Sequence, residues 1–239
     1  MRLVTWNCCR GKLEDKLPLL DPFDYDIACI QECAKSENIP GKLLWVGDNP
    51  RQGVAVVARG DYKIEPMEEH PEVLPYFVPF RVTGPRNFIL FAVWAKANKQ
   101  APYVRTVVRA IRIYYDLIER EPSVIIGDLN TNAIWVNSYA KHENHSAMVA
   151  LIKELKLDSC YHHHLKEEHG EETKPTFFLT WKEAKPYHLD FCIAPEAWLN
   201  QIIEVTVPPY DSPWNRSDHR PLFVEFGSIK KPKTRTCIE

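Results

Sequence analysis

The stretch Val124-Ile125-Ile126-Gly127-Asp128-Leu129-Asn130 decides the expected fold. Its apolar run ends in Gly, Asp and Asn, which predicts a fully buried strand followed by a turn out of the sheet. Open α/β sheets carry their sites just beyond strand ends, so Asp128 and Asn130 are candidates for chemistry. Alternate residues of an extended chain point the same way, which places this carboxylate and amide on one side. Taken alone, the stretch is equally typical of an Asx turn at a strand end.

Length and composition indicate one globular α/β domain. The chain has 239 residues, enough for one large core, with 45% hydrophobic and 26% charged residues. The formal net charge is −2, so a polyanionic ligand needs a local site rather than a global field. We expect a monomer with a single domain over residues 1–239, in which 228–239 form a flexible tail.

The cysteines favour a reducing compartment. No pair of the seven has the CxxC spacing of a zinc site. Six lie in or beside apolar strand-like runs, as small buried thiols do: Cys8, Cys9, Cys29, Cys33, Cys160 and Cys192. The sequence lacks a leader pattern and an apolar run of membrane-spanning length. We therefore expect a cytoplasmic protein that does not contact a membrane.

Further polar clusters follow other short apolar runs. They are Thr5-Trp6-Asn7, Gln31-Glu32, and the pair His188-Leu189-Asp190 and Ser217-Asp218-His219. Together with Gly127-Asp128-Leu129-Asn130, they resemble in content and order the endonuclease/exonuclease/phosphatase superfamily. That group includes AP endonucleases, DNase I-like nucleases, tyrosyl-DNA phosphodiesterases and inositol polyphosphate 5-phosphatases. The resemblance runs from Arg2 to Phe226, nearly the whole chain.

The resemblance implies a fold and a reaction. The fold is the DNase I-like four-layer sandwich, an α/β architecture of two packed, mostly antiparallel sheets flanked by helices. The antiparallel strand pattern between residues 43 and 94 also favours this arrangement. The implied activity is that of a metal-dependent phosphoric ester hydrolase with Mg²⁺ or Mn²⁺ as cofactor.

The resemblance makes Glu32 and Asp218 the metal ligands. Carboxylate oxygens suit hard cations, although Glu32 read alone would be a solvated residue opening a loop. The superfamily often places a further metal-site Asp two residues after the first Asn. Cys9 occupies that position here, so metal binding rests more heavily on Glu32 and Asp218.

The resemblance also implies the catalytic residues. Asp128, helped by Asn130, would orient or deprotonate the attacking water. Asp190 would fix the tautomer of His219 and stabilise its protonated ring, so that His219 binds a phosphate oxygen or shuttles a proton. Asn7 would contact the phosphate, although a turn Asn explains that residue equally simply.

Five further residues are candidates for substrate contacts: Trp94, Asn98, Asn132, His188 and Trp181. Trp94 stands where the superfamily usually carries Tyr or His. Its indole can donate a hydrogen bond but cannot titrate, and a core position is equally compatible. Trp181 lies in the region where AP endonucleases line a pocket for a flipped-out sugar. The residues after Asn130 lack the aromatic and basic pair of inositol 5-phosphatases.

Three local predictions complete the analysis. Apolar residues at three- and four-residue steps predict one helix over Pro102 to Glu121. Thr176 to Trp181 has the pattern of a strand. The histidines at 162–164 and His169 lie among Lys and Glu, and we interpret them as part of an exposed structural or substrate-side loop rather than a catalytic zinc site. Adventitious metal binding is an alternative for this histidine-rich stretch.

The leading functional hypothesis is a nuclease that hydrolyses DNA phosphodiester bonds. The near-neutral net charge leaves open a phosphatase or phosphodiesterase that acts on a small or lipid phosphate. An enzyme that acts on RNA is a weaker alternative. A catalytically inactive binding module is a third alternative. Retention of every central carboxylate and imidazole apart from the Cys9 position argues against it.

Overall fold

The computed structural model describes residues 1–39, 41–72, 76–96, 103–211 and 213–227. The expected tail at 228–239 and the candidate Asn98 lie outside these residues. Within the described ranges, no helix is both long and apolar enough to cross a membrane.

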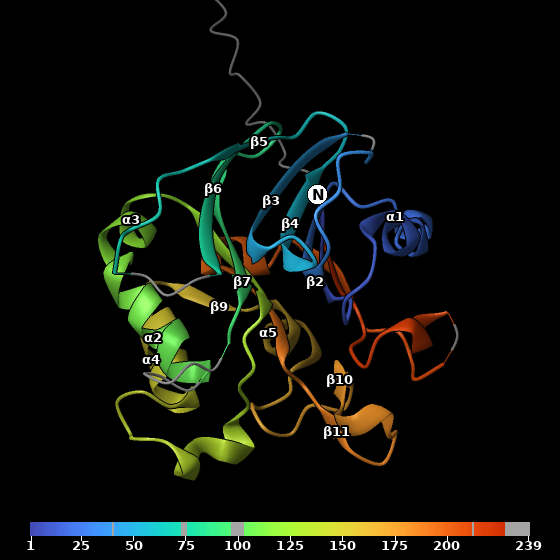
Figure 1. Ribbon diagram of the computed structural model, residues 1–239. Helices are drawn as coiled ribbons and strands as arrows, with labels where there is room; N and C mark the ends of the chain where they lie inside the picture. Colours follow the sequence, from blue (N-terminus) through green and yellow to red (C-terminus); the bar gives the residue numbers. More distant parts are fainter. Residues whose placement is uncertain (40, 73–75, 97–102, 212, 228–239) are drawn as a thin grey trace, which may run out of the picture.

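Two six-stranded sheets form the centre of the molecule (Figure 1). The first has the order β13-β14-β1-β2-β4-β3, and the second has the order β5-β6-β7-β8-β12-β9. The strands of the first are β1 (Arg2–Asn7), β2 (Ile27–Cys33), β3 (Lys42–Asn49), β4 (Gln52–Ala58), β13 (Ile202–Thr206) and β14 (Leu222–Phe226). Those of the second are β5 (Lys63–Pro66), β6 (Phe77–Thr83), β7 (Phe88–Trp94), β8 (Ser123–Asp128), β9 (Leu157–Ser159) and β12 (Asp190–Pro195).

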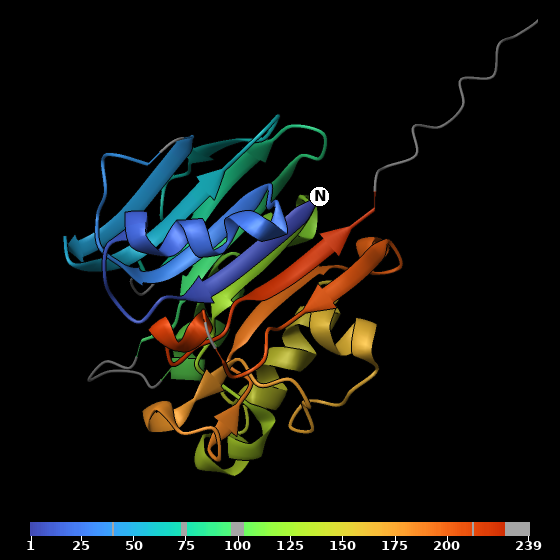
Figure 2. The ribbon, with the colours of Figure 1, turned by 90° about the vertical axis from the view of Figure 1, so that its right-hand side faces the viewer.

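Each sheet contains a single parallel pair at its centre. These pairs are β1 with β2 and β7 with β8, and the other neighbours are antiparallel. The last strand returns to lie beside the first, as Figure 2 shows for β14 and β1. A separate short hairpin pairs β10 (Phe177–Phe178) with β11 (Pro186–Tyr187).

Helices cover the two outer faces. On the side of the first sheet lie α1 (Leu13–Lys16) and the 3₁₀ turns Leu17–Leu19 and Asp21–Phe23. On the side of the second lie α2 (Tyr103–Ile113), α3 (Tyr115–Arg120) and α4 (His145–Glu154) (Figure 1). The remaining helices are α5 (Cys160–Leu165) and α6 (Glu196–Leu199), with 3₁₀ turns at Ala133–Ser138, Leu179–Trp181 and Trp214–Arg216.

Three apolar cores separate the four layers. Along β7, Leu90 packs in the core between the sheets, whereas Ile89 and Phe91 pack in the core under the helices. Successive side chains of a strand point to opposite faces, so a strand covered on both faces must be apolar throughout. This explains the continuous apolar runs of the central strands, and the expected four-layer architecture is confirmed.

Two local predictions are wrong in part. The helix expected over Pro102 to Glu121 is divided, because Tyr114 leaves helical geometry between α2 and α3. The strand expected over Thr176 to Trp181 includes only Phe177–Phe178 as strand. It stops there because Thr180 and Trp181 take positive φ values of 56° and 58°, which no extended strand allows.

The prediction of an exposed histidine loop is also wrong. Residues 162–164 lie in α5, and His162 is only 7% exposed. Polar neighbours elsewhere in the chain satisfy its ring, with Glu172 at 3.0 Å and Ser159 at 2.8 Å. The polar residues that flank His162 in the sequence do not by themselves reveal these contacts, which depend on how the chain folds.

Candidate active site

One pocket of about 480 Å³ collects most of the candidate residues. It lies where β1, β2, β7 and β8 end, together with the segment that precedes β14. Its lining consists of Asn7, Cys9, Arg10, Glu32, Trp94, Ala95, Lys96, Tyr103, Asp128, Asn130, Phe177, Asp218 and His219. Side chains more than 200 residues apart in the chain therefore share one concave site.

Strand register sets the positions of these side chains. Trp94 lies beside Asp128 in the parallel pair β7 and β8, and Asp190 faces Asp128 in the antiparallel pair β8 and β12. Asn7 ends β1 at the level of Gln31 in β2. Because the sheets pack face to face, Asn7 Nδ2 reaches Asp128 Oδ2 at 3.0 Å. The pocket thus lies where the two sheets meet.

Asp128 is fully buried and held by three hydrogen bonds. Asn7 Nδ2 and Asn130 Nδ2 donate to Oδ2, and the Asn130 backbone N–H donates to Oδ1 at 2.9 Å. Burial raises the pKa of Asp128, whereas the neighbouring His219 and the donated hydrogen bonds lower it. Asn130 can point back at Asp128 because its backbone has a φ of 47°, a region that Asn tolerates.

Gly127 allows Asp128 to lie so close to β7. A Cβ at this position would lie 1.9 Å from the carbonyl oxygen of Val93, and the φ of Gly127 is +148°. Both the close approach and the backbone angle exclude an L side chain. Gly127 is therefore a packing requirement of the parallel pair.

His219 and Asp190 form a buried ion pair beside Asp128. His219 Nδ1 lies 2.8 Å from Asp190 Oδ2. Burial alone lowers the pKa of His219, but Asp190, Asp128 and Asp218 raise it to about 9. The His219 backbone is fixed as well, since its N–H donates to Ser217 Oγ and its carbonyl accepts from Trp6 Nε1.

Glu32 projects from a bulge in β2. The register with β4 shifts between Gln31 and Cys33, and Glu32 itself has a φ of 60°. A bulge redirects a side chain that regular pleating would place elsewhere. Asn7 Nδ2 donates to Glu32 Oε1, and Gln52 Nε2 donates to Oε2, both at 3.1 Å. The carboxylate is thus anchored at the pocket while remaining partly accessible.

The residues present fit a hard divalent cation. Glu32 and Asp218 line the same pocket and offer carboxylate oxygens, which Mg²⁺ and Mn²⁺ prefer. Cys9 also lines it, next to Asp218, and burial together with that carboxylate raises the pKa of the thiol to about 11. A neutral thiol is a poor ligand for a hard cation, so the oxygen donors carry the fit.

Three candidates for substrate contact lie outside the lining of this pocket. Asn132 is 2% exposed, and its Oδ1 caps the following 3₁₀ turn by accepting from the Ile134 N–H. His188 is 1% exposed, and its Nδ1 contacts the Lys174 carbonyl at 3.1 Å. Trp181 lies on the 3₁₀ turn after β10 and is 44% exposed.

Trp94 combines the two roles considered for it. It lines the pocket, yet it is only 4% exposed and packs on Tyr76 with ring centroids 4.9 Å apart. Lys96 Nζ lies 4.1 Å from the centroid of the indole ring. The indole therefore supports a cationic side chain at the edge of the pocket.

Some site residues were not found from the sequence. Gln52, which holds Glu32, is the first residue of β4, and nothing in the local sequence signals this contact. The rings of Phe177 and His219 pack with centroids 4.6 Å apart. The backbones of the two residues also form an isolated antiparallel β-bridge. Tyr103 lines the pocket from the start of α2 at 39% exposure.

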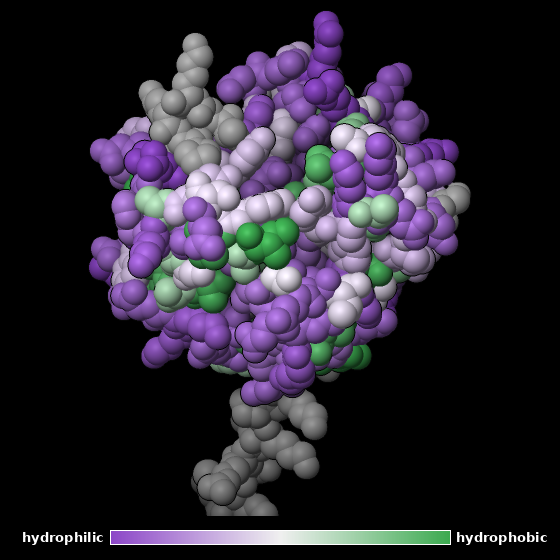
Figure 3. Space-filling view, turned by 90° about the horizontal axis from the view of Figure 1, so that it is seen from below, coloured by the Kyte–Doolittle hydropathy of each residue, from purple (hydrophilic) through white to green (hydrophobic). Residues whose placement is uncertain are grey.

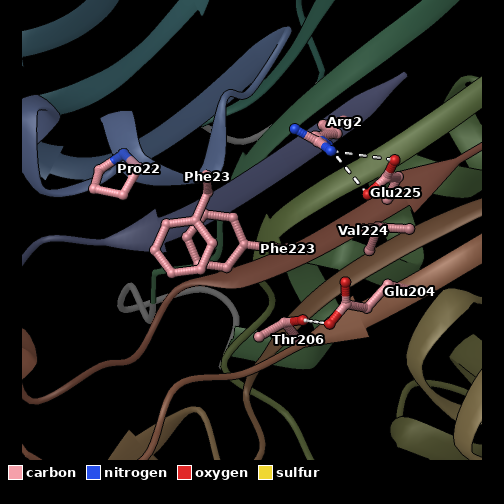
Figure 4. Close-up of a pocket in the computed structure, with 8 residues that line it drawn as sticks. All are labelled: Arg2, Pro22, Phe23, Glu204, Thr206, Phe223, Val224 and Glu225. Atoms are coloured by element: carbon pink, nitrogen blue, oxygen red, sulfur yellow. Dashed lines mark hydrogen bonds and ion pairs between the residues drawn. The ribbon is translucent and has the colours of Figure 1, made fainter.

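Another hollow, of about 200 Å³, lies on the outer side of the first sheet (Figure 4). The rings of Phe23 and Phe223 stack there with centroids 3.9 Å apart. Arg2 Nε lies 3.1 Å from Glu225 Oε2. Its lining contains none of the predicted catalytic residues. The chemistry-bearing side chains belong to the larger pocket.

Comparison with known proteins identifies the fold. No family model matches the sequence, and no curated protein matches it. The endonuclease domain of TRAS1, a telomere-specific non-LTR retrotransposon, matches with a TM-score of 0.67 and 17% identity, over 95% of this chain and 98% of that one. This chain has the fold of that nuclease domain.

Two further solved structures have the same fold. The 3′ phosphatase NExo from Neisseria, bound to a product DNA hairpin, has a TM-score of 0.66 and 18% identity over 95% of this chain and 99% of that one. An AP endonuclease from Archaeoglobus fulgidus gives the same TM-score, identity and coverage. The fold expected from the endonuclease/exonuclease/phosphatase resemblance is therefore confirmed.

Proposed function

We propose that this protein is a divalent-metal-dependent phosphodiesterase that hydrolyses DNA. The observation that carries the proposal is the convergence of Glu32, Asp128 and His219 on one pocket with Asn7 bridging two of them. Carboxylates for a cation, a buried proton acceptor and a charged imidazole are the groups that phosphoester hydrolysis requires.

Glu32 and Asp218 would hold Mg²⁺ or Mn²⁺. When bound, the cation supplies positive charge that neutralises the phosphate and stabilises the leaving oxygen. Asn7 and Gln52 keep Glu32 in place through their hydrogen bonds to its two carboxylate oxygens. Any substrate phosphate must therefore enter beside these two carboxylates.

Asp128 acts as the proton acceptor for the attacking water. The alternative base, His219, is less suited to accept a proton, because the Asp190 carboxylate at its Nδ1 stabilises the ring that already carries one. The three donors around Asp128 favour its ionised form and fix its orientation. Burial makes this carboxylate more basic than one in water, which suits a proton acceptor.

His219 donates a hydrogen bond to a phosphate oxygen. Asp190 contacts Nδ1, which leaves Nε2–H for the substrate and stabilises the positive ring. A charged donor in a buried site stabilises the negative charge that develops on the phosphoryl oxygens. Asp190 is thus a positioning residue for His219.

Two observations favour DNA over a lipid phosphate. The solved structures compared above are an endonuclease domain, an AP endonuclease and a phosphatase bound to a DNA hairpin. Arg10 and Lys96 line the pocket, and the lower face of the molecule is mostly hydrophilic, with several separate apolar patches rather than one continuous apolar surface (Figure 3). A lipid substrate would call for a larger exposed apolar surface.

A substrate panel with Mg²⁺ tests the proposal. Abasic, nicked, single-stranded and 3′-phosphorylated DNA are compared with RNA, phosphoinositides and cyclic nucleotides, each with wild type and Asp128→Asn. We expect turnover of at least one DNA substrate that depends on Asp128. Turnover confined to phosphoinositides or cyclic nucleotides would show that the substrate is a small phosphate and not DNA. Binding without turnover of any substrate would indicate a catalytically inactive binding module.

A further inference from the structure

A second polar cluster lies behind the loop that follows Asn130. It is contributed by the start of α4, by α5 and by the segment between α5 and β10, and we call it the histidine cluster: His145, His162, His169 and Glu172. One ligand atom each of His162, His169 and Glu172 lies within 4.8 Å of the others. None of the four lines the catalytic pocket.

We propose that His162, His169 and Glu172 bind a divalent transition metal of the zinc class, at a site separate from the catalytic pocket. Two imidazoles and one carboxylate form a recognised zinc ligand set, which leaves a fourth position for water. Imidazole nitrogens also favour zinc over the hard cations that suit the oxygen ligands at Glu32. The inference is independent of the proposed nuclease activity.

Each of the three ligands is already held by an outer partner. His162 Nδ1 lies 2.8 Å from Ser159 Oγ, which leaves Nε2 facing Glu172. Glu172 Oε2 accepts from Asn132 Nδ2 at 3.1 Å, and its Oε1 accepts from the Gly170 N–H at 3.0 Å. Metal-binding histidines and carboxylates are oriented by such partners, so the geometry resembles a prepared site.

His145 provides the corresponding partner for His169. His145 Nε2 lies 3.1 Å from His169 Nδ1, and His145 Nδ1 lies 3.3 Å from Thr131 Oγ1. We assign the tautomers from this network: His145 donates from Nδ1 to Thr131 and accepts from His169 Nδ1–H. The lone pair of His169 Nε2 is then available for a metal.

Burial favours the neutral form of the His145 and His169 rings. Burial and the neighbouring histidines lower the pKa of His169 to about 3. Burial also lowers the pKa of His145 to about 4, although Glu172 opposes that shift. The side chains of His162 and Glu172 are 6% and 5% exposed. Neutral imidazole is the form that binds metal, so no proton has to leave a charged ring first.

A fifth residue, His188, has a buried nitrogen that independently indicates a bound water or ion at this cluster. His188 is 1% exposed, and its Nδ1 contacts the Lys174 carbonyl. Its buried Nε2 has no hydrogen-bond partner in the part of the chain that the structure describes. The His188 ring lies 5.8 Å from that of His162, between centroids. An unpartnered buried nitrogen is costly unless a water or ion satisfies it.

Metal binding requires a small rearrangement of the cluster. The His162 and His169 rings are now stacked, with centroids 3.6 Å apart and planes inclined by 23°. Two rings that bind one tetrahedral ion through Nε2 must tilt apart, and the ion replaces the hydrogen bond between His162 Nε2 and Glu172. The ion would then tie α5 to the loop that carries Asn132, two residues after Asn130.

Cobalt binding tests the site through its visible spectrum. Chelator-stripped protein carrying Glu32→Gln, which disables the catalytic cation site, is titrated with Co²⁺ and then with Zn²⁺. We expect one equivalent of Co²⁺ to give the intense visible bands of a four-coordinate ion, and Zn²⁺ to displace it. His162→Gln and His169→Gln should each abolish these bands, and Ser159→Ala should weaken binding by about 10–100-fold.

The matched control is the double variant His163→Gln/His164→Gln, which removes two partly exposed histidines of the same helix. It should retain the bands and the stoichiometry. Zn²⁺ at a hundredfold excess over its Kd should raise the Tm of the stripped protein by roughly 5–10 °C. Failure of the stripped protein to bind one saturable equivalent, or equal loss in the control, would overturn the proposal.

Discussion

The amide of Asn7 joins the two halves of the catalytic pocket. Its Nδ2 donates to Glu32 Oε1 at 3.1 Å and to Asp128 Oδ2 at 3.0 Å, so one residue of β1 holds both the proposed metal ligand and the proposed proton acceptor. A buried amide shared by two carboxylates restricts both to one geometry. The chemistry therefore depends on single atoms placed from both sheets.

Replacing Asp128 by asparagine tests the proton acceptor. The substitution keeps the size of the side chain, but an amide cannot take a proton, so kcat should fall by about 10²–10⁴-fold with an unchanged circular dichroism spectrum. The matched control Asp61→Asn, at an exposed carboxylate, should keep full activity. Wild-type kcat in Asp128→Asn would remove this residue from the chemical step.

Replacing Cys9 by aspartate tests where the cation binds. Cys9 lines the pocket beside Asp218, and its φ of 50° is one that Asp accepts readily. A further carboxylate should tighten Mg²⁺ binding by on the order of tenfold, or about 1.4 kcal/mol, in a calorimetric titration. The neutral control Cys9→Asn should not. Equal Mg²⁺ affinity in both variants and wild type would place the cation elsewhere.

At the scale of elements, the close approach of β7 and β8 positions Asp128. Gly127→Ala should destabilise the protein by on the order of 3 kcal/mol in urea unfolding, since strain and overpacking both act there. Gly60 is the matched control, because its φ is +59° and a Cβ would meet nothing within 4 Å. Gly60→Ala should cost about 1 kcal/mol. Equal losses in both variants would contradict the packing argument.

The sequence predicted elements wherever a strand is apolar on both faces. The continuous apolar run Phe88–Trp94 coincides with β7, because burial on both faces leaves a continuous apolar signal. The turn at Thr180 and the break at Tyr114 have no such signal, since each follows from tertiary packing. Strand ends therefore indicated the candidate catalytic residues, whereas partners such as Gln52 appeared only in the structure.

At the scale of the whole molecule, the pocket exists only when the sheets are packed together. Asn7 and Glu32 come from the first sheet, and Asp128 and Asp190 come from the second. The core between the sheets fixes their relative position, and the ordered motifs predicted this convergence without its distances. The sequence drew attention to His162 and His169 but not to their convergence with His145 and Glu172, because these side chains come from segments that meet only in the fold.

We propose that the side chains of the catalytic pocket form one metal-dependent phosphodiester-cleaving site. The most direct measurement is the rate of DNA cleavage against Mg²⁺ concentration, for EDTA-treated wild type and Glu32→Gln. We predict no cleavage in EDTA, full recovery on adding Mg²⁺, and a curve for Glu32→Gln shifted to much higher Mg²⁺ or abolished. Full cleavage in EDTA, or identical Mg²⁺ curves for the two proteins, would contradict the account.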